Sequence, residues 1–237
     1  MKPLNPHIPK LLALSLCALP LSSFAADAND ELSYGYVEAD YINLDIDQED
    51  ENLNIFKNDF DNGGGYGLTL SFPINDAFFV FGDYTDTESD FNFSDNSGVV
   101  VPSNTDIKRL NLGVGFVMPM NDTSDLVLSG AYSDLDYGDF DLGGRENDFD
   151  VEDLEDSFDD LNEDPSDGYF VDAKFRTQFA PAWEGSLGLR YTDIEDADGV
   201  SVIGNVMYEF GPNWGLNLSI DAGDELVTWG AGVRYIF

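Results

Sequence analysis

Residues 169–192 read YFVDAKFRTQFAPAWEGSLGLRYT, and this stretch decides the fold of the chain. On both sides of the Ala180-Pro181-Ala182 break, almost every second residue is apolar, and the residues between are small, polar or charged. Such a period of two indicates a β-strand, because successive side chains of a strand point to opposite faces. Since a three-residue break fits only a tight turn, the stretch predicts two adjacent antiparallel strands.

The same alternation recurs along the chain and predicts an all-β protein. One face of each run is apolar, as in Tyr66, Leu68, Leu70 and Phe72, and the other is small or polar. Ten runs are expected, near 33–44, 64–72, 77–86, 108–118, 125–134, 169–179, 183–192, 200–210, 214–222 and 226–237. Alternation leaves two architectures open, because a soluble barrel or sandwich buries its apolar face and a membrane barrel exposes that face to lipid.

The connections between the runs alternate in length. Those at 73–76, 118–124, 180–182 and 211–213 are short, whereas those at 45–63, 87–107 and 135–168 are long. Outer-membrane barrels have short periplasmic turns and longer external loops. The lengths therefore favour a membrane barrel with its long loops outside the cell.

Aromatic residues gather at the two ends of the predicted strands, as in the interfacial girdles of membrane barrels. The short-turn end has Phe72, Phe78, Phe116, Phe179, Trp183, Phe210, Trp214 and Phe237, and the other end has Tyr41, Tyr66, Tyr84, Tyr132, Tyr169, Tyr191 and Trp229. The polar face is rich in glycine, which suits a narrow lumen filled by side chains. We expect a closed antiparallel up-and-down transmembrane β-barrel of ten strands, with eight or twelve as alternatives.

The first 25 residues have the features of an export signal. Lys2 and Lys10 supply positive charge, and the stretch from Leu11 to Leu21 that follows is largely apolar. Ser23-Phe24-Ala25 then forms a small-x-small cleavage site. The predicted organisation is a signal peptide over 1–25 and an outer-membrane barrel over 26–237, in a Gram-negative envelope. Cys17, the only cysteine, leaves with the signal, so no disulfide or thiolate ligand is expected.

Acidic residues dominate the charge of the chain. There are 47 acids against 10 lysines and arginines, a formal net charge of −37. Nucleic acid is excluded as a partner, because binding phosphates requires a basic surface. The only histidine, His7, also lies in the predicted signal, which leaves no histidine general base, so we expect no enzyme activity.

Five short stretches resemble a known family of small bacterial outer-membrane barrels, once described as activators of plant immunity or quorum factors. They are SYGYVE (33–38), YINLDID (41–47), VFGDY (80–84), TSDLV (123–127) and NWG (213–215). The resemblance implies an outer-membrane location and no established catalytic residue. The long acidic insertions of this chain depart from the family pattern, so no loop function is carried over.

The last strand has the pattern read by the outer-membrane assembly machinery. Gly232, Tyr235 and Phe237 match that signal, and Gly230 stands where a polar residue is usual. The same residues also suit a final strand whose side chains face lipid. Both interpretations make membrane lipid and the assembly machinery the expected partners.

Charged residues also recur on the small, polar face of the strands. They are Glu38, Asp40, Asp83, Arg109, Asp172, Lys174, Arg176, Glu184, Arg190, Glu209 and Arg234. In a lumen hardly wider than its own side chains, these charges should pair and close the barrel. The alternative is a narrow gated conduit in which the ion pairs exchange partners.

The connection at 134–167 holds 16 acids and a single base, Arg145. Val151, Leu154, Phe158 and Leu161 recur at helical spacing, which predicts a short acidic helix over 150–162. Asp139, Asp141 and Asp150 stand at positions 1, 3 and 12 of a calcium-loop template, but glycine occupies position 5. We expect this acidic segment to be a solvated surface and to hold no cofactor. The alternative is weakly bound Ca²⁺ or Mg²⁺ that bridges lipopolysaccharide phosphates.

These observations leave three classes of function. A structural or surface-interaction barrel with acidic external loops is favoured. A narrow gated channel for small solutes or ions is the main alternative. A soluble periplasmic β-protein is the third, and it requires the apolar faces to be buried.

Overall fold

The computed structural model describes residues 32–46, 59–60, 63–94, 100–137, 166–194, 197–223 and 226–237. The predicted signal peptide, the acidic helix at 150–162, and Asp139, Asp141 and Asp150 lie outside these residues. The strands are β1 (Tyr36–Ile46), β2 (Asp59–Phe60), β3 (Gly63–Asn75), β4 (Phe78–Ser94), β5 (Val100–Asn121), β6 (Ser124–Tyr137), β7 (Ser166–Ala180), β8 (Trp183–Ile194), β9 (Ala197–Glu209), β10 (Trp214–Ala222) and β11 (Leu226–Ile236).

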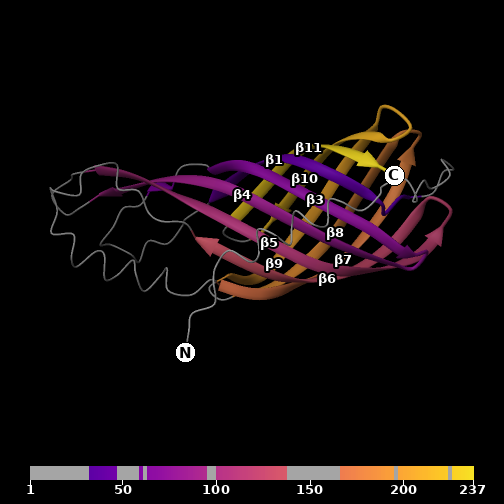
Figure 1. Cartoon of the computed structure of the whole chain (residues 1–237), viewed down its shortest axis with the longest axis horizontal. Coiled ribbons are helices and arrows are strands. Elements are labelled where there is room, and N and C mark those ends of the chain that lie inside the picture. The colour runs from indigo at the N-terminus through magenta and orange to yellow at the C-terminus, as the bar shows by residue number, and fades with distance from the viewer. Residues whose placement is uncertain are drawn as a thin grey trace, which may run out of the picture.

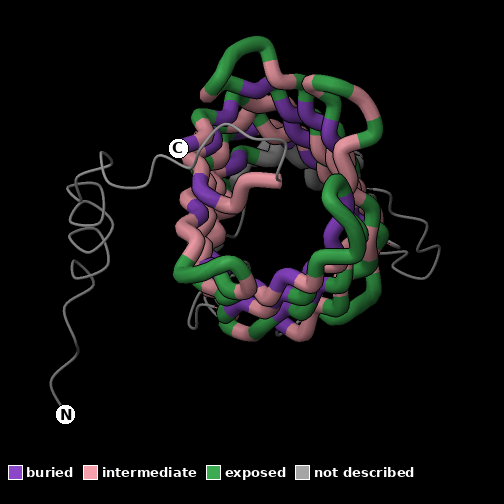
Figure 2. The backbone as a smooth tube through the Cα atoms, turned by 90° about the vertical axis from the view of Figure 1, so that its right-hand side faces the viewer, coloured by how far each residue is buried: buried purple, intermediate pink, exposed green. Residues whose placement is uncertain are grey.

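Ten of these strands form a closed ring, and β2 adds two residues to the edge of β4 (Figures 1 and 2). Strands that follow each other along the chain pair antiparallel, and β1 pairs with β11 over eleven positions, from Tyr36↔Ile236 to Ile46↔Leu226. The prediction of a closed ten-stranded antiparallel barrel is therefore confirmed. No helix among the described residues is long and apolar enough to cross a membrane.

The apolar face of the wall points outward. Leu112, Leu187 and Leu218 are 58%, 65% and 63% exposed, whereas Glu38, Asp172 and Arg234 on the other face are buried. A barrel in water would show the reverse, because apolar side chains exposed in this number would be unstable there. The inside-out arrangement expected of a membrane barrel is thus present, and the soluble alternative is wrong.

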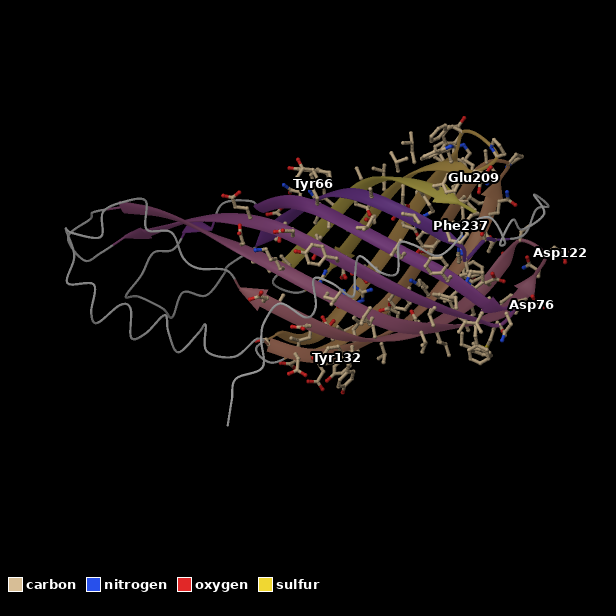
Figure 3. The ribbon with its side chains drawn as sticks, in the orientation of Figure 1. Tyr66, Asp76, Asp122, Tyr132, Glu209 and Phe237 are labelled. Carbon is tan, nitrogen blue, oxygen red and sulfur yellow. The ribbon has the colours of Figure 1, made fainter. Side chains whose placement is uncertain are left out.

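Aromatic side chains lie at both ends of the outer surface. In Figure 3, Tyr66 and Tyr132 mark the end with the long connections, and Asp76 and Asp122 mark the short-turn end. Most members of the two predicted girdles are exposed, as the outer surface requires. Phe72 and Phe116 are half-buried, and Phe237 is buried: it is 8% exposed and packs against Phe72, with 5.4 Å between ring centroids. The assignment of Phe237 to the lipid surface is therefore wrong, because it covers the start of the β1–β11 seam.

Two of the short turns are built in the same way. Oδ1 of Asn75 accepts hydrogen bonds from the backbone N–H groups of Ala77 and Phe78, and Oδ1 of Asn121 accepts one from Thr123. An asparagine side chain thereby replaces a turn of backbone. The strands consequently extend closer to these turns than the alternation predicted.

The predicted loop at 87–107 is the largest error in the expected fold. β4 and β5 remain paired through most of it, from Phe78↔Phe116 to Ser94↔Val100, and form a hairpin that projects beyond the other strands (Figure 1). Ten residues of β4 lie past Tyr84, which is about 30 Å of extended chain. The ladder hydrogen bonds stabilise this extension although its sequence lacks a clear alternation.

Glycines on the inner face of β5 make room for aromatic rings. A Cβ added to Gly115 would lie 2.0 Å from Cζ of Phe79, and one added to Gly113 would lie 2.4 Å from Cζ of Phe81. Both phenylalanines pair with these glycines across β4 and β5. The rings therefore lie across β5 and fill the short-turn end of the lumen, beside Val117 and Val127.

A valine at position 115 should disturb this packing. We expect Gly115→Val to lower the free energy of unfolding by about 1–3 kcal/mol, because the ring of Phe79 has to leave its position. Gly199→Val is the control, since nothing lies within 4 Å of a Cβ there. Urea unfolding in lipid vesicles measures both variants, and equal midpoints would contradict the packing described.

Candidate functional site: the barrel lumen

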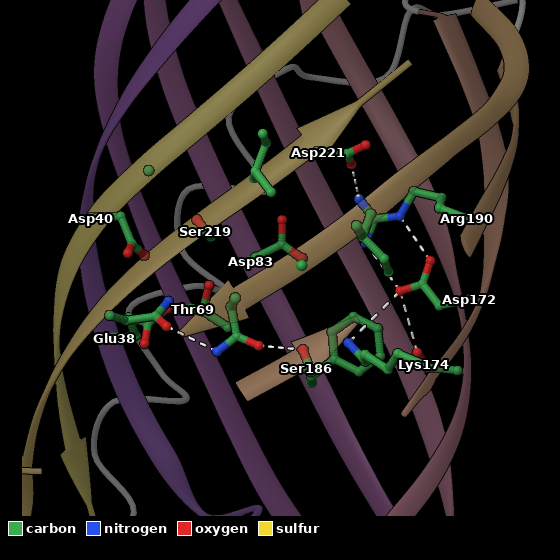
Figure 4. Close-up of a pocket in the computed structure, with 18 of the residues that line it drawn as sticks. Glu38, Asp40, Thr69, Asp83, Asp172, Lys174, Ser186, Arg190, Ser219 and Asp221 are labelled. Carbon is green, nitrogen blue, oxygen red and sulfur yellow. Dashed lines mark hydrogen bonds and ion pairs between the residues drawn. The ribbon is translucent and has the colours of Figure 1, made fainter. Parts of the chain in front are cut away.

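A cavity of about 300 Å³ occupies the lumen, and all ten strands of the ring contribute to its lining (Figure 4). Its wall alternates between small residues, which provide the space, and long charged ones, which fill it. Most of the charged lining residues fall into three groups.

The first group joins the two strands that close the barrel. Nε of Arg234 on β11 donates to Oε2 of Glu38 on β1 at 2.5 Å, and the two residues are direct cross-strand partners. The guanidinium carbon of Arg234 also lies 3.9 Å from the ring centroid of Tyr36. Both partners of the ion pair are buried.

A chain of amides continues from Glu38 across the lumen. Nδ2 of Asn217 donates to Oε1 of Glu38 at 3.0 Å, and Nδ2 of Asn205 donates to Oδ1 of Asn217 at 2.9 Å. The hydroxyl of Ser186 in turn donates a hydrogen bond to Oδ1 of Asn205. The chain links β1, β10, β9 and β8, and thus extends over four of the ten strand-to-strand steps of the ring.

The second group is centred on Arg190 of β8. Its Nε and Nη2 donate to the two carboxylate oxygens of Asp172 at 2.8 and 3.0 Å, and Nη1 donates to Asp221 of β10 at 2.8 Å. The ring of Phe170 lies below, 4.1 Å from the guanidinium carbon. Lys174 is a weaker member, with Nζ 3.9 Å from Asp172 and a side chain 31% exposed to the cavity.

The third group lies at the short-turn end. Arg176 holds Glu184 with two hydrogen bonds, from Nε at 2.5 Å and from Nη2 at 2.8 Å. The guanidinium carbon of Arg176 lies 4.5 Å from the ring centroid of Tyr34, whose hydroxyl donates to Asp125 at 2.7 Å. Arg176, Glu184 and Asp125 are all buried.

Some lumen groups are less fully satisfied. Asp83 accepts a hydrogen bond from Asn111 at 2.6 Å. Within the described part of the chain, Oδ1 of Asp40 and Nε of Arg109 are buried atoms without a hydrogen-bond partner. The lumen is therefore packed with paired charges at both ends of the cavity, and it keeps unsatisfied polar atoms on the side of β1 and β5.

Ten of the eleven residues expected in the lumen line this cavity. Glu209 does not line the cavity. It is half-buried at the short-turn end, where Figure 3 labels it. The sequence reasoning missed Tyr34, Asp125, Asn205, Asn217 and Asp221. Four of these lie an even number of positions from inward-facing residues of the same strand, and Tyr34 stands in the same relation to Tyr36 and Glu38. The strand period of two could therefore have identified all five.

No group of three or more histidine, cysteine, aspartate or glutamate side chains among the described residues is arranged to hold a metal ion. The three aspartates of the calcium-loop template lie outside those residues. Weak binding of Ca²⁺ or Mg²⁺ therefore stays a prediction.

The outward apolar face and the charged lumen are those of a membrane barrel, and one comparison gives the family. The family described as outer membrane protein beta-barrel domain matches residues 11–237. The chain belongs to this family. As an outer membrane protein beta-barrel domain, it resides among the lipids of the Gram-negative outer membrane, and no curated protein matches it.

Three solved structures are similar to this beta-barrel domain. The beta domain of the Bordetella autotransporter BrkA has a TM-score of 0.50 at 11% identity, with 87% of this chain and 100% of that one covered. OprG from Pseudomonas aeruginosa has a TM-score of 0.49 at 11% identity, covering 88% and 98%. A KdgM porin in complex with disordered oligogalacturonate has a TM-score of 0.43 at 12% identity, covering 84% and 99%. At such identities the likeness concerns the fold alone.

Breaking the seam ion pair should cost stability. Arg234→Met leaves Glu38 buried without its charge partner, so we expect the free energy of unfolding to fall by about 3–5 kcal/mol. Combining it with Glu38→Gln should restore part of that loss, because the uncompensated charge is removed. Urea unfolding in vesicles gives the values.

The exposed Lys108–Asp106 pair serves as the control, with side chains 36% and 52% exposed. Lys108→Gln should change the stability by no more than about 1 kcal/mol. If Arg234→Met were equally harmless, the ion pair would not hold the seam.

Proposed function

We propose that this protein is a non-enzymatic outer-membrane barrel that acts at the cell surface, with its lumen closed. Its short turns face the periplasm and its long connections face outward, as in other barrels of this kind. No histidine follows His7 and no cysteine follows Cys17, which leaves the barrel without the usual nucleophile–base pairs. The predicted assembly signal at Gly232, Tyr235 and Phe237 and cleavage after Ala25 belong to the same proposal.

The projecting β4–β5 hairpin is the observation that carries the proposal. A membrane strand needs about 9–11 residues, whereas β4 has 17 and β5 has 22. The additional residues of both strands lie at the long-connection end, where β4 and β5 stay paired with each other. β2 pairs with this part of β4 at Asp59↔Asn92 and Phe60↔Phe91. The part of the β4–β5 hairpin that lies beyond the bilayer is thus available for contacts outside the membrane.

The hairpin is tested by shortening it. Because Thr87 and Ile107 are direct partners, an Asn-Gly turn can replace residues 88–106 without changing the register of the barrel. We expect this variant to fold, as judged by heat-modifiable electrophoretic mobility. It should fail to restore detergent resistance to cells that lack the protein, whereas the full chain restores it. Equal protection by both would place the role in the barrel wall instead.

Lipopolysaccharide, bridged by Ca²⁺ or Mg²⁺, is the partner that fits the outer rim. Asp134 lies directly opposite Asp167, and Asp193 directly opposite Asp198, on strands just beyond the outer tyrosines. Like charges in cross-strand positions are destabilising. A divalent cation shared with a lipopolysaccharide phosphate would relieve this repulsion, with an affinity no tighter than about 10⁻⁴ M, as in extracellular calcium modules.

Removal of divalent cations tests the bridging. In lipopolysaccharide micelles, Mg²⁺ should raise the melting temperature over that in EDTA by about 4 °C, as expected when a ligand stands roughly tenfold above its dissociation constant. Substitution of Asp134, Asp167, Asp193 and Asp198 by Asn should abolish the difference. Asp76→Asn with Asp122→Asn, at the opposite end, should retain it. An Mg²⁺ effect that survives the first set would refute the bridge.

A narrow conduit is the second candidate, and the partial exposure of the second charge group favours it. Besides Lys174, the side chain of Asp221 is 30% exposed to the cavity and that of Arg190 is 21% exposed. Such groups can exchange partners around a passing ion. A steady conductance in planar bilayers that changes with Lys174→Gln or Arg190→Gln would support this candidate, and silence would favour the surface role.

A further inference from the structure

The chain that precedes β1 does not stay in the barrel wall. Ser71 on β3 donates a hydrogen bond to the backbone oxygen of Tyr34 at 2.7 Å, whereas the hydroxyl of Tyr34 donates to Oδ2 of Asp125 on β6 at 2.7 Å. β3 is the neighbour of β1, but β6 lies four strands away around the ring. Residues 33 and 34 therefore extend across the opening, and Figure 2 shows a short half-buried stretch that bends from the wall into the ring.

The side chain of Tyr34 fills the short-turn end of the lumen. Its ring stacks on that of Phe79, with 5.0 Å between centroids and 25° between planes, and Arg176 covers it from the side of β7. It packs against the buried cluster of Phe79, Val117 and Val127. Nη2 of Arg176 also donates to the backbone oxygen of Ser33 at 2.9 Å. Contacts from β3, β4, β6 and β7 thus hold two residues at the periplasmic mouth.

This segment separates the cavity from that mouth. Tyr34, Phe79 and Arg176 are at the same time lining residues of the cavity. On its inner side, the space is bordered by the partly exposed charges Lys174 and Asp221. The Tyr34 ring thus forms part of the periplasmic boundary of the polar cavity, together with Phe79 and Arg176.

Release of Ser33 and Tyr34 need not leave a buried charge without a partner. Arg176 keeps its two hydrogen bonds to Glu184, which do not involve Ser33 or Tyr34. Asp125, which would lose the tyrosine hydroxyl, lies directly opposite Arg176 on β6 and β7, and directly opposite side chains are within reach of each other. After release of the segment, Arg176 would therefore be the cross-strand partner available to Asp125, and neither buried charge would need to stay unpaired.

We propose that Ser33 and Tyr34 form a latch that closes the lumen on the periplasmic side, and that its release opens a path for hydrated ions through the cavity. The latch goes beyond the proposed surface role: it concerns how the lumen is closed, and it makes the closure reversible. An element with two satisfied positions is what a two-state switch requires.

Single-channel recording in planar bilayers with KCl tests the latch on the full-length protein. The wild type should be closed with brief openings. Tyr34→Phe keeps the ring contacts but loses the hydrogen bond to Asp125, so its open probability should rise about tenfold, the factor expected for one hydrogen bond to a charged group. Tyr34→Ala should remain open for most of the recording.

Tyr208→Ala is the matched control, because Tyr208 lies on the outer surface at the same end and packs on Trp183. It should record like the wild type. Heat-modifiable mobility verifies that each variant is folded, and if Tyr34→Ala fails to fold, Tyr34→Phe and Asp125→Asn decide the question.

Folded Tyr34 variants as silent as the wild type would overturn the latch and leave the surface role intact. A wild type that conducts steadily, with no effect of Tyr34 or Asp125, would overturn both the latch and the closed lumen. Conductance gained with Tyr34→Ala, together with unchanged detergent protection of cells, would support the latch and the surface role independently.

Discussion

Hydrogen bonding between β1 and β11 is the interaction on which the rest of the structure depends, because lipid offers no partner to an unpaired strand edge. The two strands meet over eleven positions, and the buried Glu38–Arg234 pair lies directly across the join. Backbone pairing alone would permit the strands to slip. A buried charge pair at one position disfavours every other register, since a slip would separate the charges or turn them toward lipid.

Closure also determines the chemistry of the interior. A ring of ten strands has a narrow lumen, and the period of two sends every second side chain into it. Small residues such as Gly113 and Gly115 admit rings, and arginines fill the remaining space by holding carboxylates on neighbouring strands. The lumen is therefore a polar core, and the same pairing that stabilises it also obstructs it.

Much of this architecture could be predicted from the sequence, because alternation, turn length and aromatic placement are local signals. They located ten strands, the outward apolar face and ten of the lining charges. Local signals failed where tertiary contacts decide: the extension of β4 and β5 past Tyr84 depends on their mutual ladder, and Phe237 is buried by Phe72 across the seam. The strand period of two predicts that Tyr34 faces inward, but it does not predict where the chain leaves the barrel wall.

The pairing of particular charges was equally beyond the sequence. Asp172 has Lys174 on its own strand and Arg190 across from it, yet it is Arg190 that makes the two short hydrogen bonds. A guanidinium matches both oxygens of a carboxylate, whereas an ammonium does not. Such choices depend on side-chain length and direction across strands, which a one-dimensional pattern does not contain.

A disulfide across the seam tests the central claim most directly. Ala39 and Val233 are cross-strand partners on the outer face, at a separation that suits a disulfide, so Ala39→Cys with Val233→Cys should cross-link under oxidation. We predict the cross-link in protein extracted from the outer membrane, and none for Ala39→Cys paired with Val206→Cys on β9. Cross-linking of neither pair, or recovery of the protein from the soluble periplasm, would contradict a closed barrel embedded in lipid.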